Sequence, residues 1–323
     1  MNKRHYVTIF DSKYLLRGLA LYESLCTNTR NFVLHIIAFD NESYEKLVEL
    51  NLENADIIPL EKFEDEELLS VKDKRSKGEY CWTSTAKSIL YIFDTEQCED
   101  CTYLDSDIYF FGDPEILLSE LPEEKSVLIT EHRYTPEYDQ TEISGKYCVQ
   151  FMFFKNDENS QIVLNWWKDR CIEWCYAVPE DGKLGDQKYL DDWMNCFEGI
   201  YELQHLGGGI APWNIQQYSF YREGQHMEFI HKVTGVRDQV IFYHFHNVEF
   251  FEQDVVRLTS AMYKIPSTGV FIIYKDYLRK CMQLCQKYRL VDNMKLWRNE
   301  STYNSDVEVM LYHKNFFAHS LFL

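Results

Sequence analysis

The apolar positions in the amino-terminal part of the chain fall into short continuous runs separated by stretches of helical spacing. Residues 6–10, 32–39 and 55–60 are nearly continuous runs rich in β-branched and aromatic side chains, which predict strands. Residues 15–25 and 44–52 carry apolar side chains at helical intervals. Apolar strands that alternate with helices indicate a parallel α/β sheet, in which ligands bind beyond the carboxyl ends of the strands.

The same alternation continues through the middle of the chain. Residues 82–93 and 162–176 have helical patterns, and residues 102–111, 126–130 and 147–154 have strand patterns. We find no internal repeat and no low-complexity linker in this part. The predicted fold is therefore one α/β unit with a mostly parallel central sheet.

The pattern turns helical and basic near residue 255. We therefore predict a main domain over residues 1–255 and a mainly helical carboxyl-terminal extension over residues 256–323. Between residues 264 and 300 the basic side chains outnumber the acidic ones. This pattern is typical of a solvated helix face, and it also fits a surface that contacts an anionic acceptor or, peripherally, a membrane.

The net charge of −19 argues against nucleic acid as the partner, because binding to phosphates needs a basic face. No apolar run approaches the roughly 18–20 residues that span a bilayer, and the first residues do not resemble a signal peptide. We therefore expect a cytoplasmic protein whose 10 cysteines are reduced thiols. Cys98 and Cys101 form the only CxxC pair, which is too few ligands for a typical zinc site.

The most informative segment is Leu104-Asp105-Ser106-Asp107. In an extended backbone, residues two apart point the same way, so both carboxylates are expected to converge on one cation. Oxygen ligands favour Mn²⁺ or Mg²⁺, and such ions keep open positions that a diphosphate fills. A solvated strand end, where aspartate is common, is the alternative interpretation.

In its position after a helix that carries a cation and before Gly112-Asp-Pro, this pair resembles the DxD motif of glycosyltransferases with the GT-A fold. The pattern is most similar to glycosyltransferase family 8. The resemblance implies a GT-A catalytic domain over residues 1–255, a nucleotide-diphosphate sugar donor, UDP-linked in type, and transfer to a glycan or lipid-linked acceptor with retention of configuration. It also implies that Asp105 and Asp107 bind the metal, with Ser106 beside the donor.

Two further segments fit the donor side of that family. The loop after the first strand, Phe10-Asp11-Ser-Lys-Tyr14, resembles the loop that holds the nucleotide base and ribose, which implies donor-binding roles for Phe10, Asp11 and Tyr14. Lys87 falls where the family has a basic residue that reaches the donor phosphates or sugar. A helix-capping role for Asp11 and a core-helix position for Lys87 are the structural alternatives.

Two later segments fit the catalytic and metal positions. Gly185-Asp186-Gln187 resembles the segment whose acid and amide contact the transferred sugar, so Asp186 and Gln187 are the catalytic candidates. The strand around Tyr243-His244-Phe-His246 resembles the one that supplies the third metal ligand, and the register favours His244 over His246. Asp186 as a helix cap and the histidines as core residues are the alternatives.

The chain also departs from the family pattern. Val149-Gln150-Phe151 stands where the family has Asn-Ala-Gly, so Gln150 is expected at a donor-sugar pocket of different shape. Asn247 stands where the family has glycine, and no Lys-Pro-Trp follows it. The glycine-rich stretch that ends at Trp213 and Asn214 is either a connection over the site, with Asn214 binding the donor, or an ordinary loop with a buried tryptophan.

Two other function classes stay open at this point. Aspartyl-nucleophile phosphatases also carry an Asp-x-Asp pair at a strand end, although usually near the amino terminus. A non-catalytic protein that binds nucleotide sugars would show the same motifs without turnover. The sequence leaves undetermined the donor sugar, the acceptor, the stereochemical course and the oligomeric state, because a few pocket side chains fix specificity.

Overall fold

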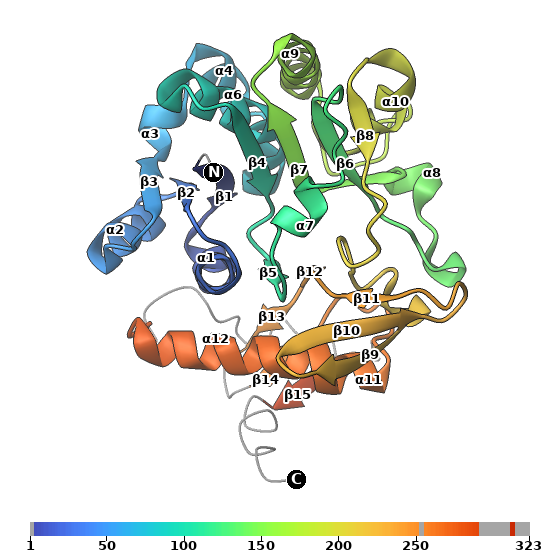
Figure 1. Cartoon of the computed structure of the whole chain (residues 1–323). Helices are drawn as coiled ribbons and strands as arrows, with labels where there is room; N and C mark the ends of the chain where they lie inside the picture. Colours follow the sequence, from blue (N-terminus) through green and yellow to red (C-terminus); the bar gives the residue numbers. More distant parts are fainter. Residues whose placement is uncertain (1–2, 252–254, 291–310, 314–323) are drawn as a thin grey trace.

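The computed structural model describes residues 3–251, 255–290 and 311–313. Figure 1 shows a central sheet covered by helices, with a smaller group of strands and one long helix below it in that view. The described helices include none that is long and apolar enough to cross a membrane.

Seven strands form the central sheet. Their order is β3 (Ala55–Pro59), β2 (Phe32–Ala38), β1 (Arg4–Phe10), β4 (Asp100–Leu104), β7 (Tyr147–Lys155), β6 (Val127–Glu131) and β8 (Ile200–Glu202). The pairings β1–β2, β2–β3, β1–β4 and β6–β8 are parallel, and β7 runs antiparallel to both of its neighbours. The predicted α/β class with a mostly parallel central sheet is therefore confirmed.

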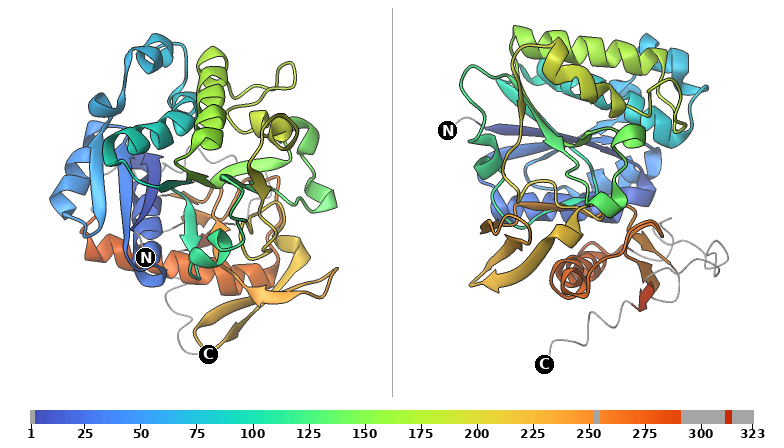
Figure 2. Two further views of the ribbon diagram at one scale, coloured as in Figure 1. Left: turned by 45° about the horizontal axis from the view of Figure 1, so that its top comes forward. Right: turned by 90° about the vertical axis from the view of Figure 1, so that its right-hand side faces the viewer.

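Side-chain alternation along β1 divides the core into two apolar layers. Tyr6 and Phe10 belong to the layer under α1 (Leu15–Asn28), whereas Val7 and Ile9 belong to the layer under α6 (Thr85–Glu96) and α9 (Glu158–Glu173). Successive residues of a strand point to opposite faces, so both faces of the sheet are buried. Figure 2 shows these helices on opposite sides of the sheet.

Apart from α2 and α12, the remaining elements are short and mostly connect the larger ones. The other helices are η1 (Ser12–Tyr14), α2 (Asn41–Leu50), α3 (Leu60–Phe63), α4 (Glu66–Lys72), α5 (Lys77–Thr83), α7 (Glu115–Leu118), η2 (Pro136–Tyr138), α8 (Thr141–Ser144), η3 (Lys188–Asp192), α10 (Trp193–Cys196), η4 (Ile215–Gln217), α11 (Ser267–Gly269), η6 (Val270–Tyr274) and α12 (Lys275–Lys287). The other strands are β5 (Ile108–Phe110), β9 (Tyr218–Glu223), β10 (His226–His231), β11 (Arg237–Gln239), β12 (Phe242–His244), β13 (Glu249–Phe250), β14 (Val255–Arg257) and β15 (Leu311–His313).

One sequence prediction needs correction at the strand expected over residues 102–111. The strand stops at Leu104, a turn closed by the bond from the Ile108 amide to the Asp105 carbonyl follows, and β5 then leaves the central sheet. β5 pairs antiparallel with β12 instead. Asp105, Ser106 and Asp107 are three polar residues in a row between two apolar runs, which fits the polar end of a strand as well as a turn, so periodicity alone did not reveal the turn.

The carboxyl-terminal helix packs on the first helix. Tyr277, Leu278 and Cys281 are buried on α12 and belong to the same apolar layer as α1. Glu23 of α1 accepts a hydrogen bond from Lys280 at 3.3 Å and binds Lys287. Part of the basic face predicted between residues 264 and 300 therefore holds α12 to the main domain. The domain boundary at residue 255 stays a prediction. Residues 291–310 and 314–323 of the predicted extension lie outside the described residues.

Close backbone packing at Gly207 leads to a stability prediction. A Cβ atom at Gly207 would lie 2.0 Å from the carbonyl oxygen of Gln239, whereas one at Gly78 meets nothing within 4 Å. We expect Gly207→Ala to lower the free energy of unfolding by about 1–3 kcal/mol, because backbone has to move. Gly78→Ala, within α5, is the matched control and should raise it by up to about 1 kcal/mol. Urea denaturation measures both, and equal midpoints for the two variants would contradict the packing argument.

Candidate metal and donor site

Asp105 and Asp107 lie in the turn that joins β4 to β5, at the carboxyl edge of the parallel strands. The Asp105 amide donates to the Gln150 carbonyl at 3.0 Å, and the Phe245 amide donates to the Asp107 carbonyl at 2.8 Å. The turn is thus fixed from both sides. Its side chains differ in exposure: the Asp105 side chain is 29% exposed and that of Asp107 11%, while Ser106 between them is buried.

His244 reaches this turn from β12. Because β12 pairs antiparallel with β5, His244 lies opposite Ile108, directly after the turn. Its Nε2 atom is 3.0 Å from an oxygen of Asp107 and 3.9 Å from an oxygen of Asp105. One ligand atom each from Asp107, His244 and His246 also lie within 4.8 Å of one another. The structure therefore brings both aspartates and both candidate histidines together.

The local charges of this cluster are strongly coupled. Burial raises the pKa of Asp105 to about 6, and the charge of Asp107 adds to this effect. Burial acts in the same direction on Asp107, but the charge and hydrogen bond of His244 outweigh it and lower the pKa of Asp107 to about 2. Burial likewise opposes protonation of His244, yet the neighbouring carboxylates raise its pKa well above the usual value. A cationic imidazole thus balances the acidic pair.

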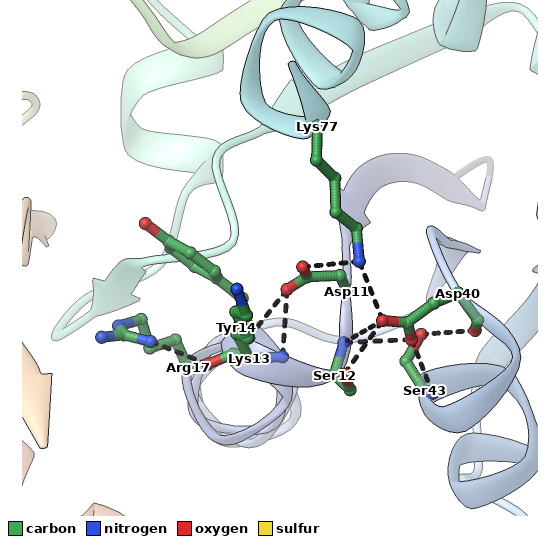
Figure 3. A network of polar contacts seen from close by, with 8 residues as sticks. All are labelled: Asp11, Ser12, Lys13, Tyr14, Arg17, Asp40, Ser43 and Lys77. Atoms are coloured by element: carbon green, nitrogen blue, oxygen red, sulfur yellow. Dashed lines mark hydrogen bonds and ion pairs between the residues drawn. The ribbon is translucent and has the colours of Figure 1, made fainter. Parts of the chain in front are cut away.

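The loop after β1 forms a polar network with the end of β2 (Figure 3). Asp11 accepts hydrogen bonds from the amides of Lys13 at 3.0 Å and Tyr14 at 3.3 Å, so it also caps η1. Lys77 of α5 lies 2.8 Å from Asp11 and 2.9 Å from Asp40. Burial acts to lower the pKa of Lys77, but these two carboxylates outweigh it and raise that pKa. One ammonium therefore joins the carboxyl ends of two parallel strands.

Tyr14 lies between this network and the acidic turn. The guanidinium of Arg17 is 4.5 Å from the centre of the Tyr14 ring, and Tyr14 is 38% exposed. Burial raises the pKa of Tyr14, and the charge of Asp107 adds to the effect. The side chain of Phe10 is instead buried in the core, where Gly18 packs against its ring. Of the predicted loop residues, Tyr14 has the most exposed ring surface.

Asp186 lies close to Asp105 but is buried from solvent. Thr85 donates to a carboxylate oxygen of Asp186 at 2.9 Å, and the Trp167 indole donates to its carbonyl at 2.8 Å. Burial raises the pKa of Asp186 to about 7, although the bond from Thr85 opposes it. The side-chain amide of Gln187 donates to the backbone carbonyl of Ser144 at 2.9 Å. Asp186 is thus a carboxyl group that changes protonation near neutral pH.

Two predicted donor-binding residues are engaged elsewhere. Lys87 forms an ion pair with Asp65. Thr85, two positions before Lys87 on α6, faces Asp186. Two positions of a helix correspond to a rotation of about 200°, so Lys87 lies on the opposite side of α6 from Asp186. Asn214 is 0% exposed and uses its amide within its own loop and on the carbonyl of His132. Its position fits the ordering of this loop better than contact with a ligand.

Trp213 closes one side of the histidine pair. Its ring centre is 5.3 Å from that of His244 and 5.6 Å from that of His246. Only 4% of Trp213 is exposed, and its indole donates to the His132 carbonyl at 3.0 Å. The tryptophan is therefore a buried wall of the site, in agreement with the alternative of a loop that contains a buried tryptophan.

A polar cavity of about 280 Å³ lies beyond this wall. Its lining includes Glu131, Arg133, Tyr134, Asp139, Lys146 and Gln217. The Tyr134 ring stacks on His132, with 4.6 Å between ring centres, and lies 6.5 Å from Trp213. The cavity is thus separated from the histidines by a short series of aromatic contacts.

A second group of potential ligands lies at His5, His35 and Glu96. The nitrogens of His5 and His35 are 3.1 Å apart, and the other nitrogen of His35 is 3.1 Å from a carboxylate oxygen of Asp56. These groups satisfy one another as a hydrogen-bonded chain. We therefore do not assign a metal to them.

The sequence did not reveal Lys77, Arg17 and His132 as neighbours of the site. Ser76 and Glu79 form a capping box that places Lys77 in the first turn of α5. The capping box predicts where α5 begins, but it does not show that Lys77 faces the ends of β1 and β2. Arg17 and His132 each have a partner nearby in the chain, Tyr14 and Tyr134. Their contacts with Val248 and Trp213 join distant positions, and no spacing rule identifies those.

A scan against protein-family models finds no match. The chain is 27% identical over 289 residues to the uncharacterized protein YfnF of Bacillus subtilis (strain 168), an alignment that covers 87% of this chain and 93% of that protein. It is 28% identical over 252 residues to the uncharacterized protein YfnD of the same strain, covering 76% of this chain and 78% of that protein. Neither relative supplies an activity.

Several solved glycosyltransferase structures are similar to this chain. An active-site mutant of LgtC is 12% identical, with a TM-score of 0.47 and coverage of 74% of this chain and 86% of that one. Apo xyloside xylosyltransferase 1 from mouse is 12% identical, with a TM-score of 0.43 and coverage of 62% and 85%. GlyE from Streptococcus pneumoniae TIGR4 is 17% identical, with a TM-score of 0.42 and coverage of 63% and 46%.

The buried carboxyl of Asp186 predicts a pH-dependent stability. Its pKa is about 7 in the folded protein against an ordinary value of 3.8, so the folded state holds a proton that the unfolded state has lost. The resulting stabilisation is complete below about pH 4 and is lost as the pH rises through 7. We expect Asp186→Asn, measured by urea denaturation in a chelator, to be more stable than the wild type at pH 8 by roughly 2–4 kcal/mol and nearly equal at pH 4.

The exposed Asp192 lies in the same segment and gives the matched control, Asp192→Asn, which should show no such pH dependence. A constant difference between wild type and Asp186→Asn from pH 4 to pH 8 would disprove the raised pKa of Asp186.

Proposed function

We propose that this protein is a metal-dependent glycosyltransferase that transfers a sugar, of the hexosyl class, from a UDP-linked donor to a glycan or lipid-linked acceptor. The observation that carries the proposal is the convergence of Asp105, Asp107 and His244 from separate elements at the carboxyl edge of a parallel sheet. Ligands of such sheets bind at this edge. The sheet itself does not determine the chemistry, so the proposal depends on these three side chains.

The donor atoms of the site fit Mn²⁺ or Mg²⁺. Two carboxylates provide hard oxygen ligands, and an imidazole nitrogen suits manganese. Asp105, Asp107 and His244 would hold the ion, since His244 lies within 4 Å of both carboxylates. His246, which groups with Asp107 and His244, is the alternative nitrogen ligand. A bound dication neutralises charge on a nucleoside diphosphate leaving group. The protein's own part is to keep both carboxylates ionised and to release the proton of the imidazole that pairs with them.

The loop after β1 is the proposed place for the nucleoside. The ring of Tyr14 is partly exposed, and it also contacts the guanidinium of Arg17. Asp11 offers a carboxylate to hydroxyl or imide donors, and Lys77 places a positive charge beside it. A base that stacks on Tyr14 and a ribose that bonds to Asp11 would direct the phosphates toward the acidic turn. Lys77 replaces Lys87 in this proposal as the cation on the donor side.

Asp186 and Gln187 are proposed to face the transferred sugar. The carboxyl of Asp186 has a pKa of about 7 because of burial, which is the range suited to proton transfer near neutral pH. The side-chain amide of Gln187 donates to the carbonyl of Ser144 in α8, the helix whose first residue, Thr141, lines the cavity. Retention of configuration is part of the proposal, and NMR of the product anomers tests it. An inverted product would assign Asp186 the role of a base acting on the acceptor.

The cavity beside Trp213 is proposed to bind the acceptor. The guanidinium of Arg133 already donates to carbonyls between residues 203 and 208, and the ammonium of Lys146 already pairs with Glu202. The carboxylate of Glu131 has no hydrogen bond among the described residues. The groups left for a ligand are therefore mainly acceptors. They favour a neutral molecule rich in hydroxyl donors, such as a sugar, over an anion.

The metal proposal predicts that both aspartates are needed for turnover. We expect Asp105→Ala and Asp107→Ala to abolish Mn²⁺-dependent hydrolysis of a UDP-sugar, a loss of at least about 100-fold, because the leaving diphosphate loses its counter-charge. Release of UDP from a panel of UDP-sugars measures the effect, and the exposed Asp94→Ala on α6 is the control. Full activity in either variant would refute the metal role, and binding without turnover in the wild type would indicate a sugar-nucleotide binder.

The acceptor proposal predicts a selective effect at Glu131. We expect Glu131→Gln to raise the KM for an acceptor glycoside by about tenfold, since a hydrogen bond to a charged group contributes about 1.5–3 kcal/mol. Hydrolysis of the donor without acceptor should stay unchanged. Transfer kinetics with a panel of methyl glycosides measure both quantities, and Glu137→Gln on the exposed surface of η2 is the control. An unaltered acceptor KM in Glu131→Gln would place the acceptor elsewhere.

A further inference from the structure

Gln150 of β7 contacts both halves of the proposed metal site. Its backbone carbonyl accepts the hydrogen bond from the Asp105 amide at 3.0 Å. Its side-chain oxygen lies 2.9 Å from Nδ1 of His244. Gln150 is 0% exposed and His244 is 4% exposed, so neither contact is shared with solvent. A single residue on the antiparallel strand therefore joins the turn that carries the aspartates to the strand that carries the histidine.

The bond to His244 has a chemical consequence for the ring. An amide oxygen only accepts hydrogen bonds, so the imidazole places a proton on Nδ1 to meet it. The other nitrogen, Nε2, is the one that lies 3.0 Å from Asp107. A neutral imidazole with its proton on Nδ1 has its free lone pair on Nε2. The ring is thus oriented so that its metal-binding nitrogen faces the acidic pair.

The unused half of the Gln150 amide supports this assignment. Its Nε2 atom is buried without a hydrogen-bond partner in the part of the chain that the structure describes. A buried donor of this kind destabilises a fold, because it has lost its hydrogen bond to water. An apolar side chain of the same length would avoid that loss. A buried unpaired donor in a native fold calls for a reason, and the bond from the other end of the amide to His244 provides one.

We infer that Gln150 is a positioning residue of the metal site, which holds the Asp105 turn and fixes His244 in the tautomer that binds metal through Nε2. This inference rests on the proposed function. Gln150 is 0% exposed, so it would act through Asp105 and His244 and not through the contact with the donor sugar that was expected from the sequence. Partners of metal-bound histidines affect metal affinity by about 10–100-fold.

The test uses the full chain with Gln150→Met, which keeps the length of the side chain and removes the amide. Mn²⁺ affinity is measured from the electron paramagnetic resonance signal of the free ion, and stability by urea denaturation. We expect the dissociation constant for Mn²⁺ to rise about 10–100-fold, while stability stays equal or increases because the unpaired N–H is gone. Met152→Leu on the same strand is the control for packing, and it should leave Mn²⁺ affinity unchanged.

A second measurement does not depend on metal. Nitrogen-15 NMR of the imidazole in the metal-free wild type should show a slowly exchanging proton on Nδ1 of His244, assigned by its loss in His244→Gln. Gln150→Glu retains an oxygen acceptor and should keep that proton, whereas Gln150→Met should lose its protection from exchange.

The outcomes separate the two proposals. A wild-type protein that binds no Mn²⁺ overturns the proposed function. Wild-type Mn²⁺ affinity in Gln150→Met, or a wild-type His244 without a proton on Nδ1, overturns the role of Gln150.

Discussion

The site depends on one antiparallel pairing, that of β5 with β12. β5 leaves the central sheet immediately after the turn at Asp105 and Asp107, and β12 returns from the carboxyl-terminal half of the chain to meet it. The register of this pair sets His244 opposite Ile108, one residue after the turn. A shift of one residue would turn the imidazole to the other face and place Tyr243 or Phe245 at the aspartates, since side chains alternate along a strand.

Electrostatics explains why such a cluster is tolerated in the folded chain. Two aspartates with little exposure repel each other and lose hydration, and both effects favour their neutral forms. His244 offsets this by lying 3.0 Å from Asp107 as a cation. The imidazolium therefore balances the carboxylates when no ion is bound. A metal ion with two charges would offset their repulsion more fully, and its binding would release the proton of His244.

The sequence was sufficient for features that depend on local patterns and insufficient for those that depend on distant partners. The apolar run at 32–39 predicted a strand buried on both faces, and every position of β2 is buried. The segment at 102–111 was predicted as one strand because its three polar residues, 105–107, fit a strand end as well as the turn that the structure shows. The convergence of the aspartates was predicted, but it results from that turn and from β12.

Lys77 and Lys87 both lie on helices near charged residues, and only tertiary packing shows which one meets Asp11. Asn214 was a candidate ligand until its amide was found bonded within its own loop.

The ammonium of Lys77 bridges Asp11 and Asp40, so the loop after β1 contains a closed ionic triad. Any molecule that donates hydrogen bonds to Asp11 competes with Lys77 for the same carboxylate. Because the Lys77 side chain is about half exposed, it would be able to turn toward a phosphate of the proposed donor while Asp40 keeps its bonds to the Ser12 and Ser43 amides. Binding of such a molecule would then replace the ion pair between Lys77 and Asp11 by one between Lys77 and the phosphate. Because α5 begins at Lys77, the first turn of this helix would shift with the side chain.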